Sequence, residues 1–176
     1  KITTEGRKAA LDLRVLNHAA PDLPDSKLNL AADKIFQVWK ETAADQGTQL
    51  VFCDLSTPSK LRRRFSAYDD LREKLQKHGV PAEQIAFIQD YDSDVQKHSL
   101  FKDIRAGRVR ILLGSTQKMG TGTNVQERLA ALHHLDAPWR PADVEQREGR
   151  ILRQGNRNKS VQIYRYVTEG SFDAYM

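Results

Sequence analysis

Short apolar runs alternate with helical patterns along most of the chain, and this alternation restricts the fold more than any other feature. Each run has about the length of an ordinary strand. The predicted strands are TQLVFCDLS (48–56), QIAFIQD (84–90), VRILLGS (109–115), LAALHHLD (129–136) and VQIYRYVT (161–168). Strands that alternate with helices pair in parallel through right-handed crossovers. The sequence therefore predicts an open, mainly parallel α/β sheet with helices on both faces.

The segments between these runs have helical spacing. Helices are predicted at 30–47, 60–79, 93–107 and about 142–154, most of them ending at a glycine. The chain of 176 residues has the size of one domain. Residues 1–26 are polar and are expected to form a helix and a connector rather than core, and 27–176 form the domain proper.

The chain has a net charge of +5 and a pI near 9.4, which favours a polyanionic partner such as nucleic acid. The densest basic run is Arg62–Arg64, and we consider both a solvated helix face and a phosphate-binding surface for it. The lone cysteine, Cys53, lies in an apolar run, which indicates a buried thiol. Five scattered histidines offer no metal-ligand spacing.

No apolar run approaches the roughly 18 residues that a membrane span needs, and the polar N-terminal segment has no signal-peptide core. We expect no membrane partner and a cytoplasmic protein.

Two loops that follow predicted strands carry unusual residues. After the strand at 109–115, Gly120 and Gly122 precede Thr123 and Asn124. Glycines let the backbone approach a ligand closely, and hydroxyl and amide groups add hydrogen bonds without charge. A tight turn between strand and helix would explain the glycines equally well.

The loop after the strand at 129–136 leads into the second unusual segment. In the helix predicted at 142–154, Gln146, Arg150 and Arg153 fall at four- and three-residue steps, hence on one face. Paired guanidinium groups suit phosphate oxygens. An exposed helix with Glu–Arg pairs, such as Glu148 with Arg147, is the alternative.

The order and spacing of these residues resemble the C-terminal RecA-like lobe of superfamily-two helicases, most closely the Swi/Snf-type DNA translocases. The resemblance covers the last two-fifths of the chain and is looser upstream. The fifth helicase motif is matched by Ser115, Thr116, Gly120, Gly122 and Asn124, the sixth by Gln146, Arg150 and Arg153, the Trp-x-Pro before it by Trp139 and Pro141, and the C-terminal ending by Val161, Tyr164, Arg165, Val167, Thr168, Gly170 and Ser171.

The resemblance implies roles for these residues. Arg150 and Arg153 would be arginine fingers that neutralise charge on the γ-phosphate of ATP, with Gln146 close to the nucleotide. The backbone of DNA would contact Ser115 and Thr116. The loop with Gly120, Gly122, Thr123 and Asn124 would couple that contact to the ATP cleft.

The chain contains neither a GxxxxGK[ST] phosphate loop nor an Asp-Glu pair for magnesium. The resemblance therefore implies that ATP and Mg²⁺ are bound mainly by a separate N-terminal RecA-like lobe, and that this chain is a piece of a larger motor, inactive alone. The first residues and the GTQLVFCDLSTP segment also resemble large phage and plasmid proteins that join a DNA methylase to such a helicase. Gly149 replaces an aspartate usual in Swi/Snf enzymes, so duplex translocation and strand separation both stay open.

Two classes of function follow. The chain is either half of an ATP-driven DNA motor, or a non-catalytic module that keeps the fold to bind nucleic acid or protein. Retention of Gln146 with both arginines favours the motor, because a binding surface needs no γ-phosphate sensor.

Overall fold

The structure is a computed structural model that describes residues 2–58, 64–120, 122–138, 140–149, 153–171 and 173. Its centre is a parallel sheet with the strand order β2-β3-β1-β4-β5. The strands are β1 (Thr48–Phe52), β2 (Ile85–Phe87), β3 (Ile111–Gly114), β4 (Leu129–His134) and β5 (Gln162–Arg165). Each lies within a run predicted to be a strand, so the predicted α/β class and the parallel pairing are confirmed.

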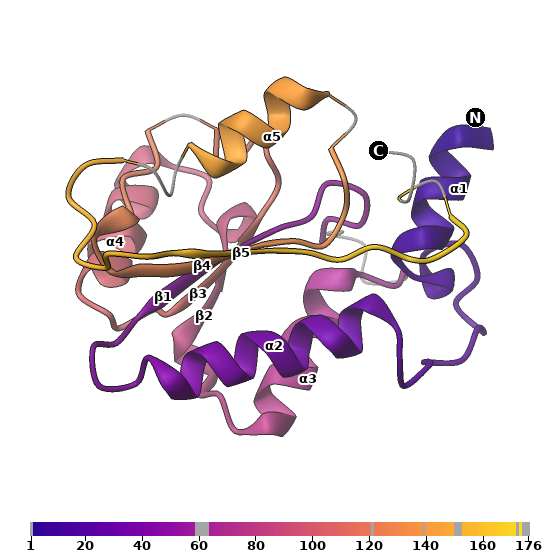
Figure 1. The fold of residues 1–176 in the computed structure, drawn as a ribbon, viewed down its shortest axis with the longest axis horizontal. Helices are drawn as coiled ribbons and strands as arrows, with labels where there is room; N and C mark the ends of the chain where they lie inside the picture. The colour runs from indigo at the N-terminus through magenta and orange to yellow at the C-terminus, as the bar shows by residue number, and fades with distance from the viewer. Residues whose placement is uncertain are drawn as a thin grey trace.

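Helices cover both faces of this sheet (Figure 1). On one face lie α2 (Lys27–Glu41) and α3 (Ala67–His78), and on the other α4 (Asp94–Arg105) and α5 (Pro141–Glu148). Single 3₁₀ turns occupy Leu13–Val15, Ala82–Gln84, Ile88–Asp90 and Gln126–Arg128. The helix predicted at 93–107 is capped at Ser93. The Ser93 hydroxyl accepts from the backbone amide of Gln96, and Oε1 of Gln96 accepts from the backbone amide of Ser93.

All four predicted helices are longer than the observed ones. The helix expected at 30–47 runs from Lys27 to Glu41, and the one expected at 93–107 ends at Arg105. The helix expected at 60–79 begins only at Ala67, because the Ser66 hydroxyl caps it by accepting from the amide of Asp69. Of the basic run, Arg64 is exposed, and Arg62 and Arg63 lie outside the described residues. The helix expected at 142–154 ends at Glu148 with Gly149 as its C-cap, so Arg153 does not lie on it.

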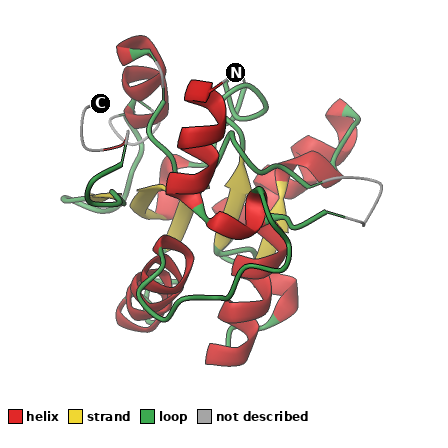
Figure 2. Cartoon of the chain, turned by 90° about the vertical axis from the view of Figure 1, so that its right-hand side faces the viewer, coloured by secondary structure: helices red, strands yellow, loops and turns green. Residues whose placement is uncertain are grey.

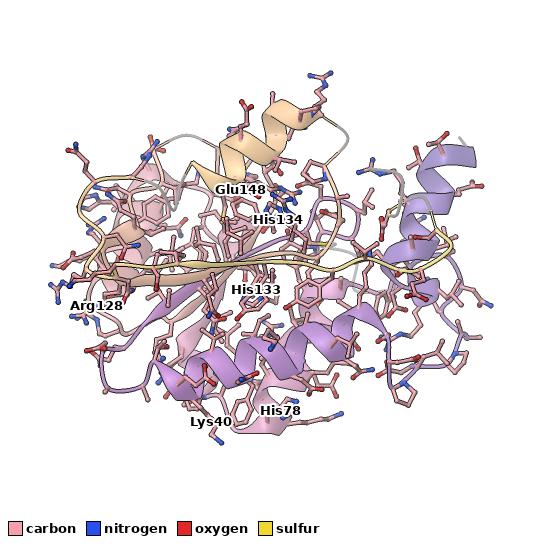
Figure 3. All side chains as sticks on the ribbon, in the orientation of Figure 1. Lys40, His78, Arg128, His133, His134 and Glu148 are labelled. Atoms are coloured by element: carbon pink, nitrogen blue, oxygen red, sulfur yellow. The ribbon has the colours of Figure 1, made fainter. Side chains whose placement is uncertain are left out.

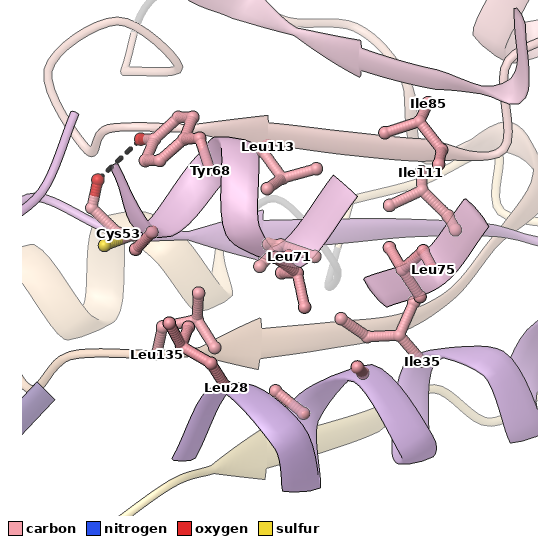
Figure 4. Close-up of a cluster of buried hydrophobic side chains, with 14 of the residues drawn as sticks. Leu28, Ile35, Cys53, Tyr68, Leu71, Leu75, Ile85, Ile111, Leu113 and Leu135 are labelled. Atoms are coloured by element: carbon pink, nitrogen blue, oxygen red, sulfur yellow. Dashed lines mark hydrogen bonds between the residues drawn. The ribbon is translucent and has the colours of Figure 1, made fainter. Parts of the chain in front are cut away.

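The core has one cluster on each face of the sheet. Between the sheet and helices α2 and α3, Tyr68 reaches across the cluster and its hydroxyl donates to the carbonyl oxygen of Cys53 at 2.6 Å (Figure 4). Burial raises the pKa of both the Tyr68 hydroxyl and the Cys53 thiol. Cys53 is therefore the buried thiol that the sequence predicts.

The N-terminal segment belongs to the same folded body as the sheet. Helix α1 (Ile2–Leu11) ends in Leu11, which is buried in the cluster beneath α2 and α3. The Thr168 hydroxyl donates to the carbonyl of Ala10 at 2.7 Å, so α1 lies against the C-terminal segment (Figures 1 and 2). Residues 1–26 were expected to form a helix and a connector rather than core. The helix is present as α1, and the buried Leu11 corrects the expectation that the segment adds nothing to the core.

Among the helices of the described segments, none combines the length and the apolar character that crossing a bilayer requires.

Candidate functional site

The carboxyl ends of three adjacent strands carry polar side chains that meet beneath α5. Asp54 follows β1, Thr116 follows β3 and Asp136 follows β4. Because β3, β1 and β4 are neighbours and parallel, these positions come together at one edge of the sheet. This is the edge at which open α/β sheets bind their ligands.

Arg147 of α5 joins all three residues. Its Nε donates to Oγ1 of Thr116 at 2.7 Å, and its Nη2 donates to Oδ2 of Asp54 at 2.7 Å and to Oδ1 of Asp136 at 3.1 Å. The side chain is fully buried, at 0% exposure, and stacks over the ring of Phe52 at 5.2 Å. A buried cation is tolerated only when it is paired and hydrogen-bonded, and here two carboxylates provide the countercharge.

The two carboxylates differ in their surroundings. Asp136 is 2% exposed, and its Oδ2 accepts from the backbone amides of Asp54 at 2.6 Å and Leu55 at 2.8 Å. The Asp54 side chain is 34% exposed, and its two oxygens accept from the amide and the hydroxyl of Thr116 at 2.7 and 2.8 Å. Asp136 thus fixes the end of β1 from inside, and Asp54 links the network to the surface.

His134 lies beneath the same guanidinium. Arginine can only donate, so Nδ1 of His134 accepts from Nη1 of Arg147 at 3.1 Å and the ring proton is on Nε2. Burial, reinforced by the charge of Arg147, lowers the pKa of His134 to about 4. His133 points to the opposite face of β4, because successive side chains of a strand alternate between its faces (Figure 3). Its ring nitrogens lie within hydrogen-bond distance of Tyr166 and Gln49, and burial lowers its pKa to about 3.

Several residues proposed from the sequence line one open cavity of about 670 Å³ at this edge. Its walls include Asp54, Thr57, Ser115, Thr116, Gln117, Gly120, Asp143 and Gln146. The structure therefore brings together four of the predicted site residues, Ser115, Thr116, Gly120 and Gln146, from the β3 loop and α5.

The β3 loop and α5 touch at Gly120. A methyl group on Gly120 would stand 2.6 Å from Nε2 of Gln146 and 3.1 Å from the carbonyl oxygen of Thr116. Only a residue without a side chain lets the glutamine lie against this backbone.

The two residues expected to meet nucleic acid have different hydrogen bonding. The Thr116 amide and hydroxyl donate to Asp54, so both donors are used within the lobe. The Ser115 hydroxyl, which is partly exposed, accepts from the amide of Lys118 at 3.2 Å. Among the described residues its proton has no acceptor, so Ser115 is the better placed of the two to donate to a phosphate.

The rest of the predicted coupling loop lies beyond this cavity. Gly122 has a φ of +71°, a conformation that favours glycine, and Thr123 is buried with no hydrogen-bond partner for its hydroxyl in the described part of the chain. Asn124 is exposed, and its backbone carbonyl oxygen accepts a hydrogen bond from Nη1 of Arg105 at 2.8 Å.

The predicted fingers are only partly described. Arg153 is exposed and lines a second pocket with Gly155, Asn156 and Lys159. Arg150 lies outside the described residues, as does Trp139 of the Trp-x-Pro match. Gln146 is exposed on α5.

Sequence reasoning missed Arg147, which it treated as part of an exposed Glu–Arg pair. Glu148 pairs instead with Arg165. A signal was present, because in the helix predicted at 142–154 Arg147 falls three residues after Val144 and four before Ile151, at the spacing of an apolar stripe. Acidic residues directly after two buried strands, Asp54 and Asp136, were the matching sign.

The family model of the helicase conserved C-terminal domain matches residues 33–155. This chain belongs to that family. The match contains β1 to β4, α5 and the whole Arg147 network, and it ends before β5. The chain is therefore a helicase second lobe, as the motifs of its last two-fifths indicated.

Two curated relatives extend the comparison. Defense against restriction protein B of Escherichia phage P1 is 34% identical over 99 residues, which are 53% of this chain and 4% of that protein. The uncharacterized ATP-dependent helicase YqhH of Bacillus subtilis is 25% identical over 164 residues, 89% of this chain and 27% of that protein. The helicase lobe thus spans about a quarter or less of the relatives that it matches.

A solved structure supports the fold. The C-terminal part of the Fun30 ATPase domain, of the Swi/Snf type, superimposes with a TM-score of 0.64 at 19% identity, covering 86% of this helicase lobe and 44% of that chain.

Proposed function

We propose that this helicase lobe is half of an ATP-driven motor that moves along DNA. The observation that carries the proposal is the joining of the β3 loop to α5 at one sheet edge: Ser115 and Thr116 share a cavity with Gln146. A site that only binds nucleic acid would not need its binding loop packed against the helix that leads to two arginines.

ATP would be held between this lobe and a first RecA-like lobe. Gln146 and Arg153 are exposed, as groups that meet a nucleotide on another lobe must be. With Arg150 they would stabilise charge on the γ-phosphate in the transition state. Mg²⁺ would be held mainly by the first lobe, together with the nucleotide.

DNA would be gripped through its phosphate backbone, with little regard to sequence. The net charge of +5 and the available Ser115 hydroxyl support this contact. We propose the cytoplasm as the setting, supported by a single buried thiol in place of disulfides.

The competing proposal is a non-catalytic module with an idle ATP cleft. A single experiment separates the two proposals. The rate of ATP hydrolysis is measured, with Mg²⁺, for the protein that contains both this lobe and its first lobe, once with duplex DNA and once without it. The motor requires turnover stimulated by DNA. It also requires no phosphate release by this chain alone, because most phosphate and magnesium ligands are elsewhere. Absence of turnover in the two-lobe protein would reject the motor.

A further inference from the structure

Two arginines are buried in the described part of this lobe, and they lie at opposite ends of the sheet. Arg110, before β3, is 4% exposed and donates to the carbonyls of Gly47 at 2.9 Å and Trp39 at 2.8 Å. Those partners belong to α2 and to the α2–β1 connection, and neither lines the cavity. Arg147, at the carboxyl ends, contacts a residue from each of three strand ends.

We propose that Arg147 is a positioning residue that makes α5 and the β3 loop, residues 115–120, move as one unit. The proposal rests on the proposed function for its consequence in catalysis, and on geometry alone for the mechanical link. It assigns no contact with ATP or DNA to Arg147 itself.

The link has two contact points on each element. On α5, Arg147 bonds the Thr116 hydroxyl, and one residue earlier Gln146 lies against the backbone of Gly120. On the loop, Thr116 is fixed from the other side by Asp54, which also holds Arg147. If a phosphate displaced Ser115, Thr116 would move with it and would shift α5 through its hydrogen bond to Arg147. A movement of α5 would shift Thr116 and Ser115 through the same hydrogen bond.

Lysine cannot replace arginine in this arrangement. The planar guanidinium presents separate donors to Thr116, Asp54 and Asp136 in a fixed fork, whereas one ammonium group is a point charge on a flexible stem. Arg147→Lys keeps the positive charge against the two aspartates but loses the fixed geometry. Arg110→Lys makes the same chemical change at a comparably buried site away from the cavity, so it is the matched control.

The mechanical link is tested in this chain. Both variants are expected to lower the thermal midpoint, because each loses buried hydrogen bonds. Only Arg147→Lys should raise hydrogen–deuterium exchange both in α5 (141–148) and in the β3 loop (115–120). Equal exchange patterns in the two variants, or loosening of α5 with an unchanged loop, would overturn the proposal.

The consequence for catalysis is tested in the two-lobe protein. Arg147→Lys should lower the DNA-stimulated kcat roughly tenfold, within the range of coupling effects, with little change in the KM for ATP. Arg110→Lys should keep the wild-type stimulation. If the wild-type protein hydrolyses ATP and the two variants lose equal stimulation, the role is merely structural and the proposal is wrong. If the wild-type protein is inactive, the proposed motor fails, and the exchange experiment still decides the mechanical link.

Discussion

Gly120 and Gln146 lie in direct contact, although one belongs to the loop after β3 and the other to α5. The Gly120 backbone does not have a positive φ, so alanine is allowed there conformationally. The new methyl group would displace the end of the Gln146 side chain, which can rotate away. It would also press on the carbonyls of Thr116 and Gln117, at a cost of about 1–3 kcal/mol.

We therefore expect Gly120→Ala to reduce ATP turnover in the two-lobe protein chiefly by displacing Gln146. The measurement is a double-mutant cycle with Gln146→Ala. Once the glutamine has been truncated, adding Gly120→Ala should cost little further turnover. Independent, additive losses would show that the contact has no part in catalysis.

Arg153→Ala should separate catalysis from stability. Because the side chain is exposed, its loss should change the free energy of unfolding of this chain by no more than about 0.5 kcal/mol. If Arg153 is an arginine finger, turnover in the two-lobe protein should fall on the order of a thousandfold, the scale of loss when such a residue is removed. Urea unfolding and steady-state phosphate release on the same variant check both values. Lys159→Ala, in the same pocket, is the control. A large loss of stability with normal turnover would contradict the finger role.

The buried histidines predict how stability depends on pH. The folded pKa values of His133 and His134, about 3 and about 4, lie below the ordinary value of 6.5. As the pH falls below 6.5, these histidines take up protons in the unfolded chain but not yet in the folded one. The free energy of unfolding therefore decreases progressively between pH 6.5 and the folded pKa values of about 4 and about 3. Between pH 7.5 and pH 5, each histidine should lower the free energy of unfolding by on the order of 2 kcal/mol.

Urea unfolding across this range tests the prediction. His133→Gln should make the dependence on pH shallower, whereas His98→Gln, at an exposed position, should leave it unchanged. An equally steep loss in the His133 variant would show that other groups cause it.

The isolated lobe should bind DNA weakly and without base preference. A lobe that makes few phosphate contacts releases few counterions, so the logarithm of the affinity should fall linearly, with a shallow slope, against the logarithm of the salt concentration. Titration of two unrelated duplexes at several salt concentrations measures the slope. Ser115→Ala should weaken binding to both equally. A marked preference for one duplex, or an affinity insensitive to salt, would contradict backbone recognition.

The sequence was sufficient to predict the sheet because buried parallel strands are continuous apolar runs bounded by turn residues. It also named four residues that line the cavity, since Ser115, Thr116 and Gly120 follow β3 and Gln146 lies on the helix after β4. It failed at two points, the local end of one helix and the tertiary contacts of one side chain. Helical spacing continues past Glu148, but Gly149 ends α5. Arg147 could be interpreted as a surface charge because its partners, Asp54 and Asp136, are 93 and 11 residues away in the chain.

The position of β5 matters to anyone who expresses this lobe alone. The family match ends at residue 155, but the parallel sheet continues to β5. In the register of the two strands His134 of β4 lies opposite Arg165 of β5, and the Tyr166 hydroxyl lies 2.8 Å from Nδ1 of His133. A recombinant fragment cut at the family boundary would lose β5, a short and mostly exposed edge strand, and would leave the longer, largely buried β4 as the edge of the sheet, with unpaired amides and carbonyls. Exposed edge strands of this kind pair with strands of other molecules. The fragment cut at residue 155 would therefore precipitate or exchange strands, whereas the fragment that includes β5 stays monodisperse.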